Sequence, residues 1–129
     1  MATRRISIMG ATGSIGKSAL DVVRHANANA GQTFQIVALA AGSDAEGLAA
    51  QAIAFNAEIA VISDESQLPT LKTLLAGTDI EAAAGETAIA EAAARPVERM
   101  LAAIVGAAGL KSTISAIRAG NDVAIANKE

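Results

Sequence analysis

The feature that most constrains this chain is a cluster of three glycines directly after its first apolar segment. Residues 4–9 (RRISIM) have the pattern of a short β-strand, and residues 10–16 (GATGSIG) follow without a break. From Ser14 onward the apolar residues recur at helical spacing. A glycine-rich turn between a strand and a helix is the setting in which a backbone can approach a nucleotide phosphate. The junction therefore predicts an α/β fold and a nucleotide site together.

The spacing of these glycines, Gly-x-x-Gly-x-x-Gly, is a variant of the dinucleotide-binding fingerprint. Gly10 permits the tight turn, Gly13 allows a pyrophosphate to approach the backbone, and Gly16 allows the helix to lie close to the sheet. Free amides and the positive end of the helix dipole favour phosphates, and the hydroxyls of Thr12 and Ser14 can add donors. The simpler alternative is that the glycines only serve a tight turn.

The rest of the chain alternates between apolar, strand-like runs and segments with helical periodicity, which predicts an α/β protein. We expect a Rossmann-like, doubly wound, mainly parallel sheet with helices on both faces and right-handed crossovers. In the first helix the predicted apolar stripe is Ile15, Ala19, Val22 and Val23. The further strands are expected at residues 34–39, 59–62, 80–84, 101–105 and 122–126. The helices are expected from Ser14 to a stop at residues 27–31, from the cap at Asp44 to about Phe55, from Ser66 or Pro69 to Leu75, and at residues 86–94 and 110–119.

Composition excludes several other classes of protein. The chain has 129 residues, 52% of them hydrophobic and 18% charged, which is typical of one globular domain. Its net charge is −3 and only 2% of its residues are aromatic, so it lacks the basic surface and stacking platforms of nucleic-acid-binding proteins. It has no cysteine, which excludes disulfides, thiol catalysis and cysteine-ligated metals.

The positive mean hydropathy of +0.39 comes from alanine and does not indicate a membrane protein. The densest apolar run, residues 100–110, lies between Arg99 and Lys111 and is shorter than the ~18–20 residues of a membrane-spanning helix. The first apolar segment is broken by glycines before a signal peptide can form. We therefore expect a cytoplasmic chain that makes no membrane contact.

The end of the second predicted strand carries a second signal for a nucleotide. Gly42, Ser43 and Asp44 stand where the adenosine ribose of a dinucleotide lies. An acidic side chain there favours NAD, whereas a small one tolerates the 2′-phosphate of NADP. Asp44 is equally suited to cap the following helix. These residues leave the choice between NAD and NADP open.

Two later segments also follow predicted strands. Residues 103–110 (AIVGAAGL) are small, which either leaves room for a flat ligand or allows a helix to pack closely on the sheet. Asn127, Lys128 and Glu129 come directly after the last strand, where polar side chains can meet a ligand. Lys128 could hold a substrate phosphate as a point charge, and the alternative is a solvated turn.

The sequence offers no catalytic or metal-binding cluster. His25 is the single histidine and is expected on the surface near the end of the first helix, beside Arg24. The acidic residues are scattered without the spacing of metal ligands, and a Ser/His/Asp arrangement is not supported. We therefore assign neither a catalytic residue nor a metal ligand to this segment.

Taken in order, these motifs resemble the N-terminal domain of 1-deoxy-D-xylulose 5-phosphate reductoisomerases. That family is much longer, so the resemblance implies that residues 1–129 are its NADPH-binding domain and lack turnover alone. The alternatives are another NAD(P)-dependent dehydrogenase, such as an aspartate-semialdehyde type, or a non-catalytic nucleotide-sensing module. The segments that carry the resemblance are residues 8–16, 20–25, 37–42, 102–110, 117–120 and 126–129.

The resemblance implies a reaction and its cofactors. The family converts 1-deoxy-D-xylulose 5-phosphate, a small phosphorylated sugar, to 2-C-methyl-D-erythritol 4-phosphate in the non-mevalonate pathway of isoprenoid biosynthesis. A divalent metal (Mg, Mn or Co) assists the skeletal rearrangement, and NADPH then delivers a hydride. The metal ligands are expected beyond Glu129, and the full-length enzyme is expected to be a homodimer.

The resemblance also assigns roles to individual residues. Thr12, Gly13, Ser14 and Ile15 match the pyrophosphate turn for NADPH, and Gly42 and Ser43 match the adenosine-ribose segment. Asn127 and Glu129 match cofactor-side positions, whereas Lys128 matches a substrate-contacting one. The family often has a basic residue in place of Ser43 and asparagine in place of Asp44, so recognition of the 2′-phosphate is where this chain departs from the pattern.

Overall fold

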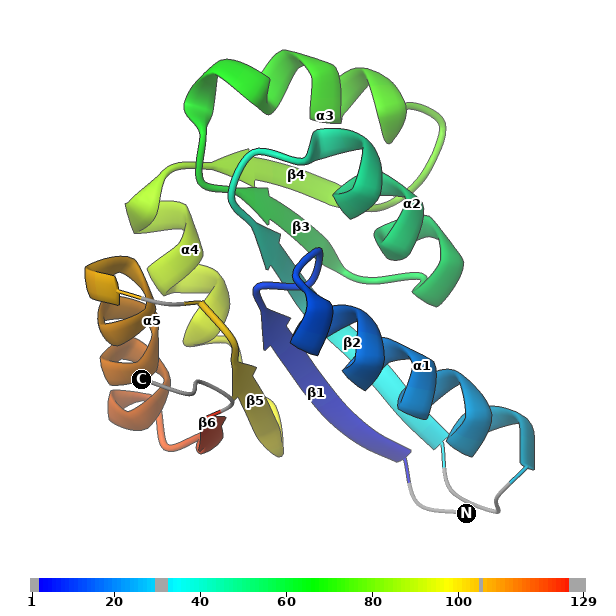
Figure 1. Cartoon of the computed structure of the whole chain (residues 1–129), viewed down its shortest axis with the longest axis vertical. Helices are drawn as coiled ribbons and strands as arrows, with labels where there is room; N and C mark the ends of the chain where they lie inside the picture. The colour runs from blue at the N-terminus through cyan, green and yellow to red at the C-terminus, as the bar shows by residue number, and fades with distance from the viewer. Residues whose placement is uncertain (1–2, 30–32, 105, 126–129) are drawn as a thin grey trace.

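A single parallel β-sheet forms the centre of the molecule (Figure 1). The computed structural model describes residues 3–29, 33–104 and 106–125 of the chain. The six strands lie in the order β4-β3-β2-β1-β5-β6, and each neighbouring pair is parallel. The strands are β1 (Thr3–Met9), β2 (Thr33–Ala41), β3 (Ile59–Ile62), β4 (Glu81–Ala84), β5 (Arg99–Ala102) and β6 (Asp122–Ile125).

Helices cover both faces of this sheet, which confirms the predicted fold class. Side chains of α1, α2 and α3 pack against one face, and side chains of α4 and α5 pack against the other. None of the described helices combines the length and the apolar character that a membrane crossing requires. The helices are α1 (Ser14–Asn29), α2 (Ala45–Phe55), α3 (Leu68–Leu74, after a 3-10 turn at Glu65–Gln67), α4 (Glu86–Ala93) and α5 (Gly106–Arg118).

The core is built on strands that are buried on both faces, as is typical of parallel sheets. All four residues of β3 are buried, and so is β2 from Ile36 to Ala41. Several of these core strand residues are alanine, which has a low intrinsic β propensity. Their small side chains are accommodated because helices cover the strands closely from both sides. Tertiary burial therefore outweighs local propensity in this sheet.

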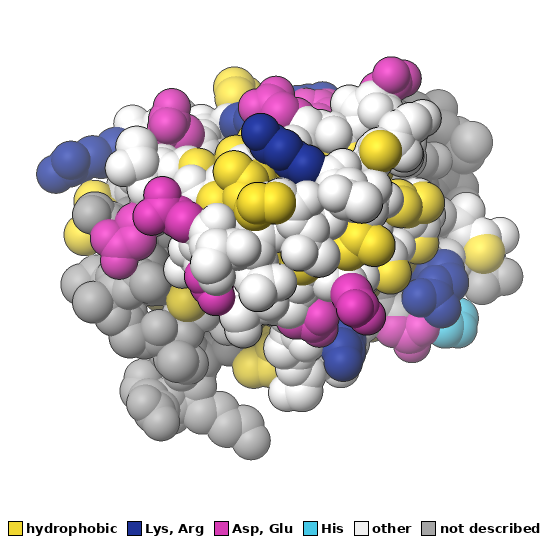
Figure 2. All heavy atoms as spheres, turned by 90° about the horizontal axis from the view of Figure 1, so that it is seen from above, with side chains coloured by type: hydrophobic (Ala, Val, Ile, Leu, Met, Phe, Trp, Pro, Cys, Tyr) yellow, Lys and Arg dark blue, Asp and Glu magenta, His cyan; other side chains and the backbone are white. Residues whose placement is uncertain are grey.

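The surface carries charges of both signs. On the face seen from above in Figure 2, acidic and basic side chains are interspersed among apolar ones, and neither sign gathers into a patch on the described part of that face. A stripe of one sign would attract a polyelectrolyte such as nucleic acid. The mixed surface agrees with the small net charge of −3.

The predicted apolar face of the first helix was confirmed for Val23 and for Ala19, which packs against the core, but it was wrong for Ile15 and Val22. Leu20 and Val23 are buried against the sheet, whereas Val22 is 67% exposed and Ile15 is 38% exposed. The buried positions begin at Gly16 and recur at helical spacing. Gly16 must lie against the preceding turn, so this contact sets the rotation of α1 and turns Ile15 and Val22 outward.

The boundaries predicted around the fifth strand were also wrong. β5 occupies Arg99–Ala102 rather than residues 101–105, and α5 begins at Gly106 rather than at residue 110. The strand ends where its partner ends, because Ala102 pairs with Met9, the last residue of β1. Part of the small-residue segment 103–110 is therefore the first turn of a helix, although glycine has a low helix propensity.

A buried asparagine ties the chain after α5 to the end of α4 and to the segment that follows it. Asn121 is 8% exposed and stands between α5 and β6. Its Nδ2 donates to the carbonyl oxygens of Ala93 (3.1 Å) and Arg95 (2.9 Å), and its Oδ1 accepts from the Val97 amide (3.2 Å). One side chain thereby satisfies three main-chain groups of the segment that links α4 to β5.

We expect Asn121→Ala to lower the free energy of unfolding by about 2–3 kcal/mol, because three polar main-chain groups lose their partner. Chemical denaturation of the chain measures this loss. The matched control is Thr70→Ala, which truncates an exposed polar residue of α3 and should leave the stability within about 0.5 kcal/mol. Equal stabilities of the two variants would contradict the anchoring role of Asn121.

Candidate functional site

The glycine turn lies where the order of the strands reverses. The chain proceeds from β1 outward through β2, β3 and β4, and β5 and β6 then lie on the other side of β1. In such sheets ligands bind in the crevice at the carboxyl ends of the strands, next to the reversal. The turn from Gly10 to Gly13 leaves the carboxyl end of β1 at this place.

Main-chain hydrogen bonds anchor the turn to both neighbouring strands. The amides of Gly10 and Ala11 each donate to the carbonyl oxygen of Ala40 in β2, both at 2.8 Å. On the other side, the amide of Ala103 donates to the carbonyl oxygen of Met9 at 2.9 Å. The turn is therefore held in one position by the sheet itself.

Two of the three glycines are required by the fold. Gly10 has a φ of +94°, and a Cβ atom there would stand 2.8 Å from the carbonyl oxygen of Ala103. A Cβ atom on Gly16 would overlap the carbonyl oxygen of Gly10 and stand 2.7 Å from that of Ala11. Any other residue at either position would push the turn, the strand or α1 out of place.

Gly13 differs from the other two glycines. It is exposed, and the nearest atom to a Cβ atom there would be the carbonyl oxygen of Gly10, at an ordinary contact distance of 3.6 Å. The packing of the described residues therefore does not demand a glycine at this position. The alternative that the glycines only serve a tight turn explains Gly10 and Gly16, but it does not explain Gly13.

The amino end of α1 opens directly onto this turn. The first helical hydrogen bond runs from the Lys17 amide to the carbonyl oxygen of Gly13, at 2.9 Å. The amides that precede Lys17 in a helix have no helical partner and carry the positive end of the helix dipole. Ser14 and Ile15 are exposed, so an anion can reach the amino end of α1.

A second exposed segment borders the site at the end of β2. Met9 pairs with Ala40, so the carboxyl ends of β1 and β2 lie side by side. Gly42 and Ser43 follow β2 and are exposed, and a Cβ atom on Gly42 would meet no atom within 4 Å. The two segments predicted from the sequence to bind one cofactor are thus neighbours in space.

Asp44 is the N-cap of α2, which confirms one of its two predicted roles. Its Oδ1 accepts a hydrogen bond from the Gly47 amide at 2.9 Å. A carboxylate at this position also interacts favourably with the helix dipole. The carboxylate that would favour NAD at the ribose position thus caps α2 through one oxygen and stays exposed beside Ser43.

Other predicted residues lie outside the site or outside the described residues. Asn127, Lys128 and Glu129 lie outside the described residues. β6, the last described strand, ends at Ile125 beside Ala102, which is at the same edge of the sheet as the glycine turn. His25 is exposed, as expected, with Nδ1 2.9 Å from the carbonyl oxygen of Asp21. Residues 3–29, 33–104 and 106–125 contain no group of three histidine or acidic side chains that could hold a metal ion.

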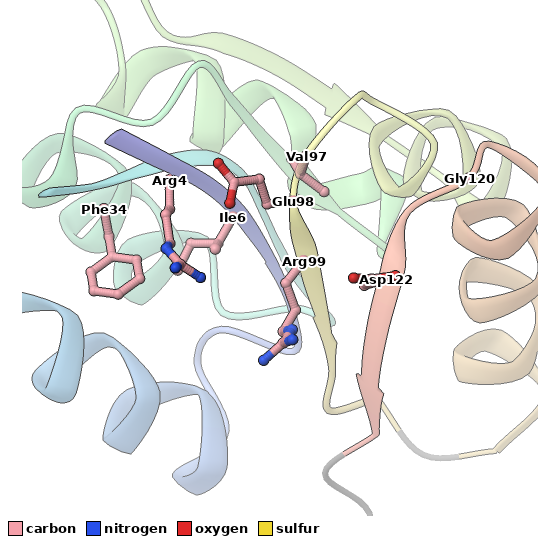
Figure 3. Close-up of a pocket in the computed structure, with 8 residues that line it drawn as sticks. All are labelled: Arg4, Ile6, Phe34, Val97, Glu98, Arg99, Gly120 and Asp122. Carbon is pink, nitrogen blue, oxygen red and sulfur yellow. The ribbon is translucent and has the colours of Figure 1, made fainter. Parts of the chain in front are cut away.

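One pocket of about 370 Å³ lies at the opposite edge of the sheet (Figure 3). Figure 3 shows its lining residues at the amino ends of β1, β2, β5 and β6. Arg4, Phe34, Arg99 and Asp122 are among them. Because ligands of such sheets bind at the carboxyl ends, this pocket is not part of the candidate site.

The structure adds one residue to the site that the sequence analysis missed. Nε2 of Gln51, in α2, donates a hydrogen bond to the carbonyl oxygen of Ala11 at 2.9 Å. Forty positions separate the two residues, so their contact has no signature in the local sequence pattern. The turn is therefore contacted by strand backbone on one side and by a helix side chain on the other.

A parallel sheet covered on both faces, a glycine turn at the strand-order reversal and an open helix terminus define a Rossmann-type nucleotide-binding domain. The sequence model of 1-deoxy-D-xylulose 5-phosphate reductoisomerase matches residues 6–129 of the chain. The chain belongs to this family, as the resemblance of its motifs predicted.

Individual relatives agree with this assignment. The reductoisomerases of Rhodopseudomonas palustris (strain BisA53) and Gluconobacter oxydans (strain 621H) are 48% and 49% identical over 126 residues. These matches cover 98% of this chain and 30% of each relative, so the chain spans less than a third of their length.

Solved structures of the family have the same fold. The Zymomonas mobilis reductoisomerase in complex with NADPH is 45% identical and has a TM-score of 0.92, over 98% of this chain and 32% of that one. A reductoisomerase in complex with NADPH, fosmidomycin and magnesium is 36% identical and has a TM-score of 0.87, over 98% of this chain and 30% of that one.

We expect Gly16→Ala to lower the free energy of unfolding by about 1–3 kcal/mol, because overpacking against the turn outweighs the better helix propensity of alanine. The matched control is Gly42→Ala at the same edge of the sheet, where a Cβ atom meets no atom within 4 Å. This control should leave the stability unchanged or raise it by up to about 1 kcal/mol. A Gly16→Ala variant as stable as the Gly42→Ala control would refute the close contact.

Proposed function

We propose that this chain is the NADPH-binding domain of a 1-deoxy-D-xylulose 5-phosphate reductoisomerase. The observation that carries the proposal is the open amino end of α1 at the strand-order reversal, with Gly13 exposed in front of it. A relative of nearly the same fold was solved in complex with NADPH. Phosphate groups bind such helix termini through main-chain amides and the helix dipole.

The described residues fit this cofactor. Thr12, Gly13, Ser14 and Ile15 would hold the pyrophosphate, since no Cβ atom at Gly13 blocks its approach and two hydroxyls can donate to it. Gly42 and Ser43 would border the adenosine ribose, where Gly42 leaves open space. The Asp44 carboxylate stays exposed beside this segment while its Oδ1 caps α2, so it does not itself favour NADPH, and the preference for NADPH over NADH is proposed from family membership.

The reaction of the whole enzyme follows from family membership as a proposal. The substrate would be 1-deoxy-D-xylulose 5-phosphate, with Lys128 holding its phosphate and Asn127 and Glu129 on the cofactor side. NADPH supplies a hydride when bound, and the divalent metal of the family would take its ligands outside this chain. The part played by residues 1–129 is to bind the cofactor and to orient it toward the strand ends.

Membership in the reductoisomerase family decides against the aspartate-semialdehyde type of dehydrogenase that the glycine turn alone left open. We further propose that the full-length enzyme is a homodimer located in the cytoplasm, as the resemblance implies. The lack of a membrane-crossing helix among the described residues is compatible with this location.

Gly13→Asp should abolish detectable NADPH binding, because a carboxylate at the amino end of α1 repels the cofactor phosphates. The fold should keep its stability, since Gly13 is exposed and aspartate is a favourable N-cap residue. Isothermal titration calorimetry with NADPH measures binding, and thermal unfolding checks the fold.

The control for this variant is Ala28→Asp, which adds the same charge at an exposed position about 20 Å away along α1 and should bind NADPH like the wild type. A wild-type chain without saturable NADPH binding would refute the proposed function. Unchanged binding by Gly13→Asp would place the cofactor elsewhere.

Ser43→Arg should tighten NADPH binding by about two- to fivefold and leave NADH binding unchanged, because an exposed arginine can pair with the 2′-phosphate. Competitive titrations of the variant with the two cofactors provide the measurement. Ala28→Arg, at the exposed far end of α1, is the control for added charge. Equal tightening of NADPH and NADH would contradict the assignment of Ser43 to the ribose end.

A further inference from the structure

We infer that Gln51 is a positioning residue for the nucleotide-binding turn. The inference rests on the proposed function, because it assigns to Gln51 the task of orienting the main chain that would bind the cofactor phosphates. Gln51 does not belong to the glycine motif and lies in the middle of α2. Its hydrogen bond to the Ala11 carbonyl oxygen is the observation that carries the inference.

This bond completes the anchoring of one residue of the turn. Ala11 is fully buried, and its amide donates to the Ala40 carbonyl oxygen at 2.8 Å. Its own carbonyl oxygen accepts from Nε2 of Gln51 at 2.9 Å. β2 therefore holds the amide of Ala11, and α2 holds its carbonyl group.

The orientation of the Ala11 carbonyl group decides the direction of the next amide. The carbonyl of Ala11 and the N–H of Thr12 belong to one planar peptide unit and point in opposite directions. By fixing the oxygen, Gln51 also fixes the direction of the Thr12 amide. Thr12 is the first of the residues proposed to hold the pyrophosphate, so Gln51 acts on the site through the backbone.

The same carbonyl oxygen also sets how closely α1 approaches the turn. A Cβ atom on Gly16 would stand only 2.7 Å from the Ala11 oxygen, so the two groups are packed closely. If this peptide unit rotated, the oxygen would move against the first turn of α1 or leave a gap there. Gln51 thereby helps to fix the position of the amino end of α1 relative to the turn.

The other end of the Gln51 amide supports a specific role for the bond. Oε1 of Gln51 is buried and has no hydrogen-bond partner among the described residues. A buried acceptor without a partner disfavours the folded state, so packing alone would favour an apolar side chain at this position. Its helix neighbours Leu48 and Ala52 are indeed apolar and buried. The bond to Ala11 is the interaction that glutamine adds.

Gln51→Met in the full chain tests the inference, because methionine has a similar shape and no amide donor. Hydrogen exchange of the amides of Gly10, Ala11 and Lys17 reports on the turn and the start of α1 without any cofactor, because each of them donates to a main-chain carbonyl oxygen. We expect these amides to exchange about two- to tenfold faster, as the loss of one hydrogen bond predicts, with exchange in β2 and β3 unchanged. The dissociation constant for NADPH should rise by a similar factor.

The matched control is Gln67→Met, which replaces the glutamine before α3, whose side chain makes no capping hydrogen bond. It should change neither the exchange of the turn nor NADPH binding. Unchanged exchange of the Gly10, Ala11 and Lys17 amides in Gln51→Met would overturn the inference. Equal acceleration throughout the sheet would also overturn it, since that pattern indicates general destabilisation.

A separate result identifies failure of the proposed function. If the wild-type chain does not bind NADPH but Gln51→Met still accelerates exchange in the turn alone, the proposed function fails and the positioning of the turn by Gln51 is supported. If the wild type binds NADPH and Gln51→Met binds it equally well, Gln51 does not position the site and the inference is overturned.

Discussion

At the start of α1, the main chain of Gly16 packs directly against the main chain of the preceding turn. Gly16 lies against the carbonyl groups of Gly10 and Ala11, and no room remains there for a side chain. This contact brings the helix terminus to the end of β1, fixes the rotation of α1, and determines which of its residues are buried. Leu20 and Val23 then reach the core, whereas Val22 turns to solvent. The anion-binding geometry and the packing of one face of the sheet thus have a common origin.

The sheet supplies the second half of this arrangement. β2 accepts two hydrogen bonds from the turn through Ala40, and the segment after β5 contacts it through Ala103. Because the strand order reverses between these two neighbours, the turn faces the crevice at the carboxyl ends of the strands. A rigid scaffold therefore presents a few main-chain amides, and relatives of this chain were solved with NADPH on the same fold.

Local sequence patterns predicted much of the fold and part of the candidate site. The order of strands and helices, the α/β class and the position of the glycine turn all follow from apolar periodicity and from residues with special backbone freedom. The boundaries of β5 and α5 did not follow, because the strand ends where its partner β1 ends and not where its own apolar run ends. The sequence named both ends of the candidate cofactor site, Thr12 to Ile15 and Gly42–Ser43, but not Gln51, which contacts the turn from α2.

Residues close together in the chain decided the class of fold, because turn, strand and helix preferences act over a few neighbouring positions. Only the folded molecule decided the rotation of α1, the capping use of Asp44 and the long-range bonds of Gln51 and Asn121. Each of the long-range bonds joins groups that are distant in sequence and adjacent only after the sheet has assembled. The spacing of residues along the chain does not predict such contacts, because they depend on how whole elements pack against one another.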